Sequence, residues 1–387
     1  MRTRTDSTSG EGDPGGAIAR WREGGCARRD DPTGSHAVAS LPPAHLVHPV
    51  RPVSSGPSAR HILILRAGAI GDFVLTLPAL AALRQAFPNA RLTLVGNASA
   101  APLALRCGYA DAIHSIDETW VSDLFDASGR HSAELRRRLA DVDLAVVWLR
   151  DPDGPVAANL RALGVETLAV PSFPPTGARR HVADHLLSTL LPLGIGDGDA
   201  RPRLLLPEAD RASADAFWTD NTLDRGTTVV ALHPGSGGAR KNWHSERFAA
   251  VADRLTERGA RILLVGGPAD ERPVDEVRRS LQVARPVGVA VASLVELAAV
   301  LARCAAFLGN DSGVTHLSAA VGTPTVAVFG PTDPAVWAPR GERVTVLWKS
   351  LDCSPCSIRP DRRCPDRRCL ELVSADEALR AVAAYCR

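Results

Sequence analysis

One pattern occurs twice in this chain and constrains its fold more than any other feature: a short apolar run, a glycine-rich turn and an amphipathic helix. The first copy has its apolar run at residues 62–66 and its turn at 67–71. The second has its apolar run at residues 227–232 and a helix predicted over 245–258. A strand that leads through a tight turn into a helix is the repeating unit of parallel sheets covered by helices on both faces. We therefore predict an α/β protein with two such units.

Further apolar runs extend both units. In the first unit, strands are predicted at residues 91–96, 144–149 and 166–170, with a helix at 132–139. In the second unit, strands are predicted at residues 261–265, 305–308 and 325–329, with a helix at 312–321. Pro78 predicts a kink in the helix that follows the first turn. Between the units, residues 191–207 are rich in glycine and proline, which predicts an interdomain linker.

The length of 387 residues agrees with two domains, because one domain takes roughly 150 residues. We expect a disordered extension at residues 1–59, an N-terminal domain at 60–205 and a C-terminal domain at 206–387. The extension is rich in Gly, Pro and Arg and shows no apolar period. Two doubly wound domains in series leave a cleft between the carboxyl edges of their sheets, where such folds bind ligands.

Composition and charge exclude several classes of protein. The chain has 45 basic and 43 acidic side chains, so it lacks the basic excess of a nucleic-acid-binding protein. The uncharged stretch 312–332 contains Gly, Pro and hydroxyl residues, and a buried helix followed by a buried strand explains it better than a membrane span. With no signal peptide either, we expect a cytoplasmic protein. The basic runs 136–138 and 179–180 indicate at most a peripheral contact with anionic lipid, and a solvated face explains either run better.

The first candidate site is the turn RAGAIGD at residues 66–72, which leaves the first predicted strand. Its glycines, Gly68 and Gly71, do not have the spacing of a dinucleotide-binding turn. Asp72 stands where the next helix begins, and two interpretations remain open. Asp72 caps that helix, or it projects from the sheet edge into the cleft and acts as a general base.

The second candidate site is HPGSGGARKNW at residues 233–243. Glycines leave backbone N–H groups open to phosphate oxygens, and Lys241 adds a compact positive charge. Lys241 and Lys349 are the only lysines among the 45 basic residues, which favours a function for Lys241 over a plain connecting loop.

The third candidate site is GNDSGVTH at residues 309–316, between a buried strand and a helix. Ser312 and His316 share one face at the start of this helix, where free amides and the helix dipole attract anions. A structural role for the histidine is the alternative. Asp270 follows another predicted strand and could bind ribose hydroxyls, or be a solvated surface charge.

Four of the eight cysteines crowd near the C-terminal end: Cys353, Cys356, Cys364 and Cys369. The spacing between the two pairs is shorter than in a zinc ribbon. A structural zinc site, reduced thiols and a redox-labile clasp all remain open, and we assign the cluster no catalytic role.

Together these motifs resemble glycosyltransferase family 9, the ADP-heptose:lipopolysaccharide heptosyltransferases. The resemblance covers about residues 61–387 and depends on four motifs in the same order, at residues 64–88, 233–243, 309–316 with 319–324, and 329–339. The cysteine cluster looks like that of the branch that adds the second heptose. The resemblance implies a GT-B fold, in which two Rossmann-like doubly wound domains face a central cleft. The first domain would hold the acceptor and the second the nucleotide-sugar.

The resemblance also implies roles for individual residues. Asp72 corresponds to the proposed general base, and Lys241 to the lysine near the donor phosphates. Gly68 and Gly71 form the loop on the acceptor side. The residues implied or expected to bind the donor are Gly235, Ser236, Gly237, Lys241, Asp270, Asp311, Ser312, Gly313 and His316.

The implied activity is a metal-independent, inverting transfer of heptose from ADP-heptose to a lipopolysaccharide-core or related cell-envelope glycan. The nucleotide-sugar is a co-substrate, and no cofactor is required. Two alternatives share the fold but transfer nothing to an acceptor: a sugar-nucleotide epimerase, and a catalytically silent sugar-nucleotide-binding protein.

Overall fold

The computed structural model describes residues 58–386, except residues 197, 224, 225, 290, 292, 357–363 and 365. The extension predicted at residues 1–59 falls almost entirely outside this part of the chain.

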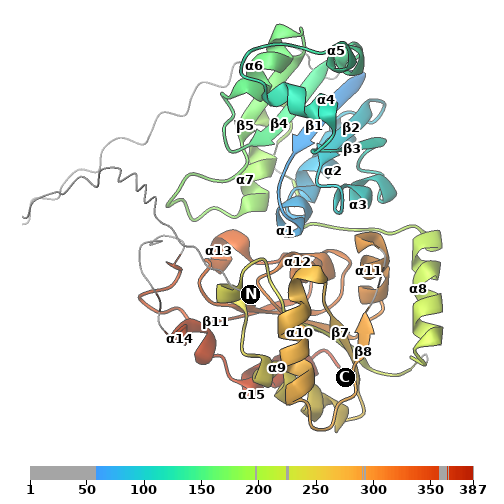
Figure 1. Ribbon diagram of the computed structural model, residues 1–387, viewed down its shortest axis with the longest axis vertical. Coiled ribbons are helices and arrows are strands. Elements are labelled where there is room, and N and C mark those ends of the chain that lie inside the picture. Colours follow the sequence, from blue (N-terminus) through green and yellow to red (C-terminus); the bar gives the residue numbers. More distant parts are fainter. Residues whose placement is uncertain are drawn as a thin grey trace, which may run out of the picture. The chain divides into compact units, whose positions relative to one another are not determined.

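In the described part of the chain, the strands form two parallel sheets (Figure 1). The N-terminal sheet has the strand order β3-β2-β1-β4-β5. Its strands are β1 (His61–Arg66), β2 (Arg91–Gly96), β3 (Ala112–Ser115), β4 (Leu144–Leu149) and β5 (Glu166–Pro171). Its helices are α1 (Ile70–Val74), α2 (Leu77–Ala86), α3 (Ala101–Arg106), α4 (Thr119–Ser122), α5 (Ala133–Leu139), α6 (Pro155–Ala162) and α7 (Val182–Ser188).

The C-terminal sheet has the strand order β11-β10-β9-β6-β7-β8. Its strands are β6 (Val229–His233), β7 (Arg261–Val265), β8 (Val287–Val289), β9 (Ala306–Asn310), β10 (Thr325–Phe329) and β11 (Val344–Trp348). The helices of this half are α8 (Glu208–Asp220), α9 (Ser245–Thr256), α10 (Glu271–Ser280), α11 (Leu294–Leu301), α12 (Gly313–Ala320), α13 (Pro334–Trp337), α14 (Arg368–Glu371) and α15 (Ala375–Ala383).

Both sheets are buried on both faces, which explains why their central strands are continuous apolar runs. In β1, Ile62 and Ile64 join a buried cluster with α1, α2 and α7, whereas Leu63 and Leu65 join a second cluster with α4, α5 and α6. In β6, Val230 belongs to a third cluster, which it shares with α9, α10 and α15. The prediction of an α/β protein with doubly wound parallel sheets is confirmed.

The predicted strands and helices match the structure in type, and the differences have local causes. The helix expected after the first turn is two helices, α1 and α2, which are separated at Leu75 and Thr76. Pro78 lies in the first turn of α2, where its missing N–H leaves no hydrogen bond unmade. The edge strands β3, β8 and β11 were not predicted because they are short or only partly buried and lack a clear apolar run.

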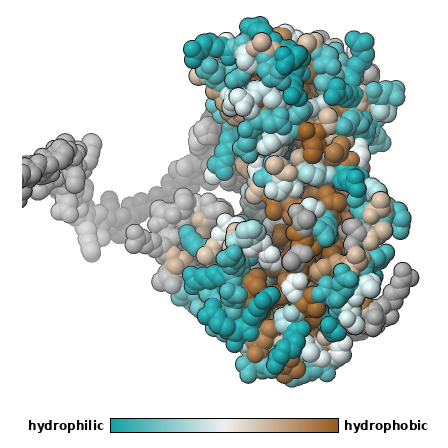
Figure 2. Space-filling model, turned by 45° about the vertical axis from the view of Figure 1, so that its right-hand side comes forward, coloured by the Kyte–Doolittle hydropathy of each residue, from teal (hydrophilic) through white to brown (hydrophobic). Residues whose placement is uncertain are grey.

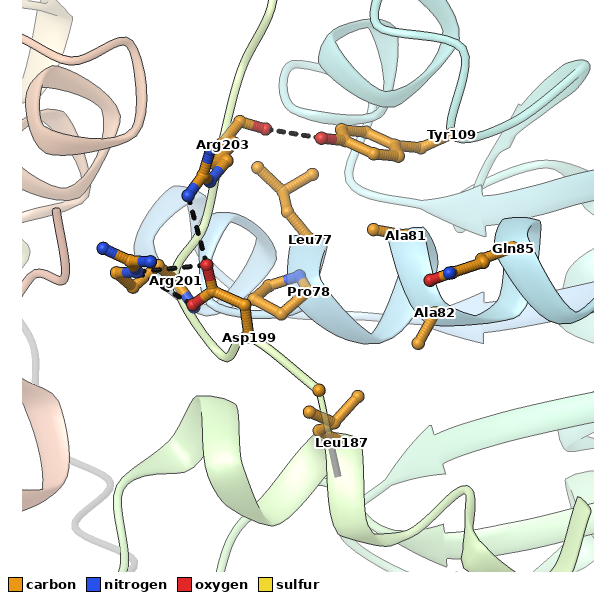
Figure 3. A pocket seen from close by; sticks show the side chains of 11 residues that line it. Leu77, Pro78, Ala81, Ala82, Gln85, Tyr109, Leu187, Asp199, Arg201 and Arg203 are labelled. Atoms are coloured by element: carbon orange, nitrogen blue, oxygen red, sulfur yellow. Dashed lines mark hydrogen bonds and ion pairs between the residues drawn. The ribbon is translucent and has the colours of Figure 1, made fainter. Parts of the chain in front are cut away.

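The segment that joins the two halves is extended and held by polar contacts. Asp199 accepts hydrogen bonds from Arg201 Nε at 2.9 Å and from Arg203 Nη2 at 3.2 Å, and Tyr109 Oη donates to Arg203 O at 2.8 Å (Figure 3). The two arginines lower the pKa of Asp199 to about 2. This segment, α2 and α7 line a cavity of about 190 Å³. None of the predicted site residues lines it.

Among the described helices, none combines the length and the apolar character that crossing a membrane requires. On the face shown in Figure 2, hydrophilic and apolar side chains are both present, with the apolar ones gathered mainly in its middle and lower part. The basic run at residues 136–138 is partly neutralised, because Arg137 and Arg138 both pair with Glu134. These pairs favour the solvated-face interpretation of that run.

Candidate active site

The turn after β1 places the Asp72 side chain against the backbone of the same turn. Gly68 has a φ of +144°, and a Cβ on it would lie 2.9 Å from both the Cβ and the Oδ2 of Asp72. Asp72 Oδ2 accepts a hydrogen bond from the Ala69 N–H at 3.1 Å, so the carboxylate caps α1. Its other oxygen, Oδ1, has no hydrogen-bond partner among the described residues. The structure therefore shows the capping contact of Asp72, and its role as a general base stays a prediction.

A buried arginine, Arg66, is hydrogen-bonded to residues of this turn and of the segment that follows it. Arg66 is 2% exposed at the end of β1, and it donates to Thr76 Oγ1 at 3.0 Å and to Asp72 O at 3.4 Å. Its guanidinium lies 5.3 Å from the centre of the Phe173 ring. Burial lowers the pKa of Arg66, and the charge of Asp72 opposes that shift. The sequence analysis did not select Arg66, although a basic residue that ends an apolar strand was a usable signal.

The glycine-rich loop after β6 approaches other chain segments closely at one glycine and is open at another. A Cβ on Gly235 would overlap the Asp270 carboxylate, whereas nothing lies within 4 Å of the position that a Cβ on Gly237 would take. Ser236 Oγ accepts from the Gly238 N–H at 3.2 Å and lies 2.5 Å from Asn242 Oδ1. Ser236 thus shapes the loop, and the open glycine leaves its backbone accessible.

Lys241 is oriented by a buried carboxylate. Lys241 Nζ lies 2.8 Å from Asp311 Oδ2, and the same oxygen accepts a hydrogen bond from Thr332 Oγ1 at 2.7 Å. The Asp311 side chain is 7% exposed, whereas the Lys241 side chain is 34% exposed. Asp311 therefore fixes the ammonium group at the surface of the site and leaves part of it available to an anion.

An arginine also holds the Lys241 loop. Arg367 Nη1 donates to Ala239 O and to Asn242 O, both at 3.2 Å. Nearby, Arg247 Nη1 donates to the carbonyl oxygens of Leu370 and Glu371, at 3.2 and 2.6 Å. The segment between Cys364 and Cys369 thus supports the loop that presents Lys241.

The start of α12 is capped by its own serine and packed against α1. Ser312 Oγ accepts from the Thr315 N–H at 3.3 Å. A Cβ on Gly313 would lie 2.7 Å from Ile70 Cβ, and one on Gly71 would lie 3.2 Å from His316 Cδ2. The turn that contains Asp72 therefore meets the helix start that contains Ser312, Gly313 and His316.

His316 is buried and incompletely satisfied. It is 4% exposed, and its Nδ1 has no hydrogen-bond partner. Burial lowers the pKa of His316 to about 4; the charge of Asp311 opposes the shift, and those of His181 and Lys241 add to it. The imidazole is thus neutral near pH 7, and its Nδ1 is a buried polar atom without a hydrogen-bond partner among the described residues.

Asp270 also has internal partners. Its Oδ2 lies 3.2 Å from His233 Nε2 and accepts from the Gly267 N–H at 2.9 Å. Burial raises the pKa of Asp270, but the hydrogen bond and charge of His233 and the Gly267 N–H outweigh burial and lower it overall. A cavity of about 460 Å³ lies beside this loop, with Glu271 and Arg278 in its wall. Asp270 does not line that cavity.

Further contacts fasten the segment after β5 to residues 333–340. His181 Nε2 lies 2.9 Å from Ala338 O, and Arg340 forms two hydrogen bonds of 2.6 Å with the Asp184 carboxylate. Arg179 Nε lies 3.2 Å from Asp333 Oδ2. The second basic run is therefore engaged in the contact between the two halves.

The four clustered cysteines are free thiols. Burial raises the pKa of Cys369 to about 11, and neighbouring Cys356, Cys364 and Cys353 add to the shift, so these thiols lie near one another. Among the described residues, no group of three or more His, Cys, Asp or Glu side chains is arranged to hold a metal ion. The zinc alternative for this cluster stays a prediction.

Three comparisons relate the chain to known proteins. Residues 178–365 match the family model "Glycosyltransferase family 9 (heptosyltransferase)". The chain is 25% identical over 335 residues to lipopolysaccharide heptosyltransferase 3 of Escherichia coli K12, which covers 80% of this chain and 94% of that protein. It is 27% identical over 311 residues to lipopolysaccharide heptosyltransferase 1 of Pseudomonas aeruginosa, with coverages of 76% and 85%.

Solved structures show the same fold. The glycosyltransferase family 9 structure from Veillonella parvula is 22% identical, with a TM-score of 0.69 over 84% of this chain and 97% of that one. The E. coli heptosyltransferase WaaC, solved with ADP, is 20% identical, with a TM-score of 0.58 over 84% and 99% of the two chains. The two parallel α/β sheets are thus arranged as in the GT-B heptosyltransferases.

Proposed function

This chain belongs to glycosyltransferase family 9, and we propose that it transfers heptose from ADP-heptose to a lipopolysaccharide-core or related cell-envelope glycan. The observation that carries the proposal is the meeting of the Asp72 turn with the start of α12. A carboxylate that can take a proton thereby lies next to a helix start suited to a diphosphate.

The proposed donor site belongs to the C-terminal sheet. The open glycine-rich loop, Lys241 and the free N–H groups at the start of α12 would bind the diphosphate. The cavity beside Glu271 would take the nucleoside, because its walls include Gly266 and Gly267, which follow the carboxyl end of β7. The relative solved with ADP supports an adenosine diphosphate in a site of this fold.

The proposed reaction is a single displacement. Asp72 takes the proton from an acceptor hydroxyl, whose oxygen forms a bond to the anomeric carbon while the bond from that carbon to the diphosphate oxygen breaks. The configuration at the anomeric carbon inverts. Lys241 and the amides of α12 stabilise the charge that develops on the departing ADP, so these groups of the chain supply the electrostatic stabilisation that the step requires.

The acceptor is proposed to bind at the carboxyl edge of the N-terminal sheet, beside Gly68 and Gly71. An acceptor of this class is a glycolipid, which would bring the protein to a membrane surface without a spanning helix. We propose that this contact is peripheral and on the cytoplasmic side.

The direct test measures ADP release from ADP-heptose with and without heptose-free lipopolysaccharide core. We expect release that depends on the acceptor, and a fall in kcat of about 100-fold or more in Asp72→Asn with ADP affinity unchanged. An epimerase would convert the donor without acceptor, and a silent binder would hold ADP without turnover. Either result would exclude the transfer. Full activity of Asp72→Asn would exclude only the role of Asp72 as base.

A further inference from the structure

Three loops of the C-terminal sheet are connected by one chain of buried side chains. His233 ends β6, Asp270 follows β7, and Ser312 follows β9. His233 Nε2 lies 3.2 Å from Asp270 Oδ2, and His233 Nδ1 lies 3.1 Å from Ser312 Oγ. The three residues are 2%, 9% and 7% exposed. The sequence analysis selected Asp270 and Ser312 as donor contacts and did not select His233, which connects them.

The hydrogen bonds among these three side chains constrain which atoms donate and which accept. An ionised Asp270 can only accept, so His233 Nε2 carries a proton and donates it. Nδ1 lies 3.1 Å from Ser312 Oγ, which also lies 3.0 Å from Thr315 Oγ1. Ser312 Oγ in turn accepts from the Thr315 N–H at 3.3 Å. Asp270 Oδ2 and Ser312 Oγ are therefore both engaged inside the protein.

Asn310 extends the same arrangement to the glycine-rich loop. Its Nδ2 donates to Pro234 O at 2.8 Å and to Gly235 O at 3.2 Å, and its Oδ1 accepts from the Trp243 N–H at 2.9 Å. Gly235 lies so close to Asp270 that no Cβ fits between them. The loop that is proposed to hold the diphosphate is thus supported directly by Asp270 and Asn310.

We infer that Asp270, His233 and Ser312 form a buried relay that positions the glycine-rich loop and the start of α12 around the donor diphosphate. In this role they are positioning residues, and the donor is bound by backbone N–H groups and Lys241. The inference extends the proposed donor site and depends on it. It assigns a role to His233 and replaces a ribose contact by Asp270 with a structural one.

A positioning role and a direct ligand contact for Asp270 and Ser312 predict different binding constants. If Asp270 touched the ribose and Ser312 touched a phosphate, their substitutions would weaken ADP binding independently and their effects would multiply. Asp270→Asn would then also weaken the binding of adenosine, which has the ribose but no phosphate. In a relay, the second substitution adds little to the first, and adenosine binding does not change.

The test titrates ADP and adenosine into the intact wild-type chain, Asp270→Asn, Ser312→Ala, His233→Gln and the double variant Asp270→Asn/Ser312→Ala. Asp220→Asn, at an exposed position in α8, is the matched control. We expect each single variant to raise the Kd for ADP about tenfold, or about 1.4 kcal/mol, and the double variant to raise it by no more than about twofold beyond that. The Kd for adenosine should stay within about twofold. Thermal unfolding midpoints identify any variant that fails to fold, and the remaining variants then carry the comparison.

The relay would be overturned if the two single substitutions multiply their effects on the Kd for ADP in the double variant, or if Asp270→Asn loses adenosine binding. Either result would leave the proposed function intact. An unchanged Kd for ADP in all three single variants would overturn it as well. If the wild-type protein binds no ADP, the same series is run with the nucleoside diphosphate that it does bind. A wild-type protein that binds none would refute the proposed function and the relay together, and this result is distinct from the other two.

Discussion

Single residues of this protein show how a motif and its geometry can assign different roles to one side chain. Asp311 and Asp270 were both expected to bind the donor. In the structure, Asp311 holds Lys241, and Asp270 holds His233. A carboxylate that follows a strand at the sheet edge is visible in a sequence, but its partner comes from a loop many residues away. The sequence could therefore predict which residues gather at the site, but not which of them face each other.

The first prediction concerns Lys241. Replacing it by methionine removes the charge but keeps most of the apolar stem, and we expect ADP affinity to fall at least tenfold, as for loss of a charged hydrogen bond. Isothermal titration measures the affinity. Lys349→Met is a matched control, because Lys349 is also about one-third exposed and lies 2.8 Å from the carboxylate of Glu377. Equal affinity in both variants would contradict the role of Lys241.

The Lys241 experiment needs one more variant. Removing the ammonium leaves the buried Asp311 carboxylate with Thr332 as its remaining side-chain partner, which destabilises the folded state. The double variant Lys241→Met/Asp311→Asn removes that buried charge. We expect it to recover folding stability but not ADP affinity, which separates the two effects.

At the scale of elements, glycine determines how closely helices approach. The meeting of α1 with α12 depends on Gly71 and Gly313, and neither has a positive φ that would have required glycine for its backbone. The sequence predicted both helices from apolar spacing and turn chemistry. It could not predict their contact, because a close approach between residues 71 and 313 is a property of the tertiary structure.

The second prediction follows from this contact. Gly313→Ala would place a methyl group 2.7 Å from Ile70 Cβ and 2.9 Å from the Gly71 nitrogen, so α1 and α12 must move apart. We expect kcat to fall at least tenfold while far-ultraviolet circular dichroism stays unchanged. Gly196→Ala, where nothing lies within 4 Å of the added Cβ, is the control. Wild-type turnover in Gly313→Ala would show that the close contact is not needed for catalysis.

At the scale of the whole molecule, sequence reasoning was most successful where periodicity is strong. The central strands of both sheets were predicted, because burial on both faces makes them continuous apolar runs. Short edge strands such as β8, with three residues, carry no such signal. The ion pair between Arg340 and Asp184 was equally invisible, since nothing in the local sequence of either residue indicates the other.

The third prediction concerns stability in acid. Burial lowers the pKa values of His181 and His316 to about 4, and it also lowers those of His185 and His244. Below the ordinary histidine pKa of about 6.5 the unfolded chain takes up protons that the folded chain does not. The free energy of unfolding should therefore fall as the pH drops from about 6.5 to about 4. The loss at pH 5 is of the order of 2 kcal/mol for each of His181 and His316.

Urea unfolding at pH 7 and pH 5 measures this loss. The glutamine in His181→Gln can still donate a hydrogen bond to Ala338 O. In this variant the free energy of unfolding should differ less between pH 7 and pH 5, by the contribution of His181. If wild type and variant lose the same free energy of unfolding between pH 7 and pH 5, other groups cause the acid sensitivity.

The support that Arg367 gives to the Lys241 loop has a consequence for synthesis of the chain. Arg367 lies 128 and 125 residues after its partners Ala239 and Asn242. At the usual ribosomal rate of about 5–20 residues per second, these partners are made roughly 6–25 s before Arg367. During that interval the nascent C-terminal sheet can begin to form around β6, β7 and β9, but the loop that presents Lys241 lacks the hydrogen bonds from Arg367. The nascent chain should therefore become able to bind the donor only late, once residue 367 has emerged from the ribosome.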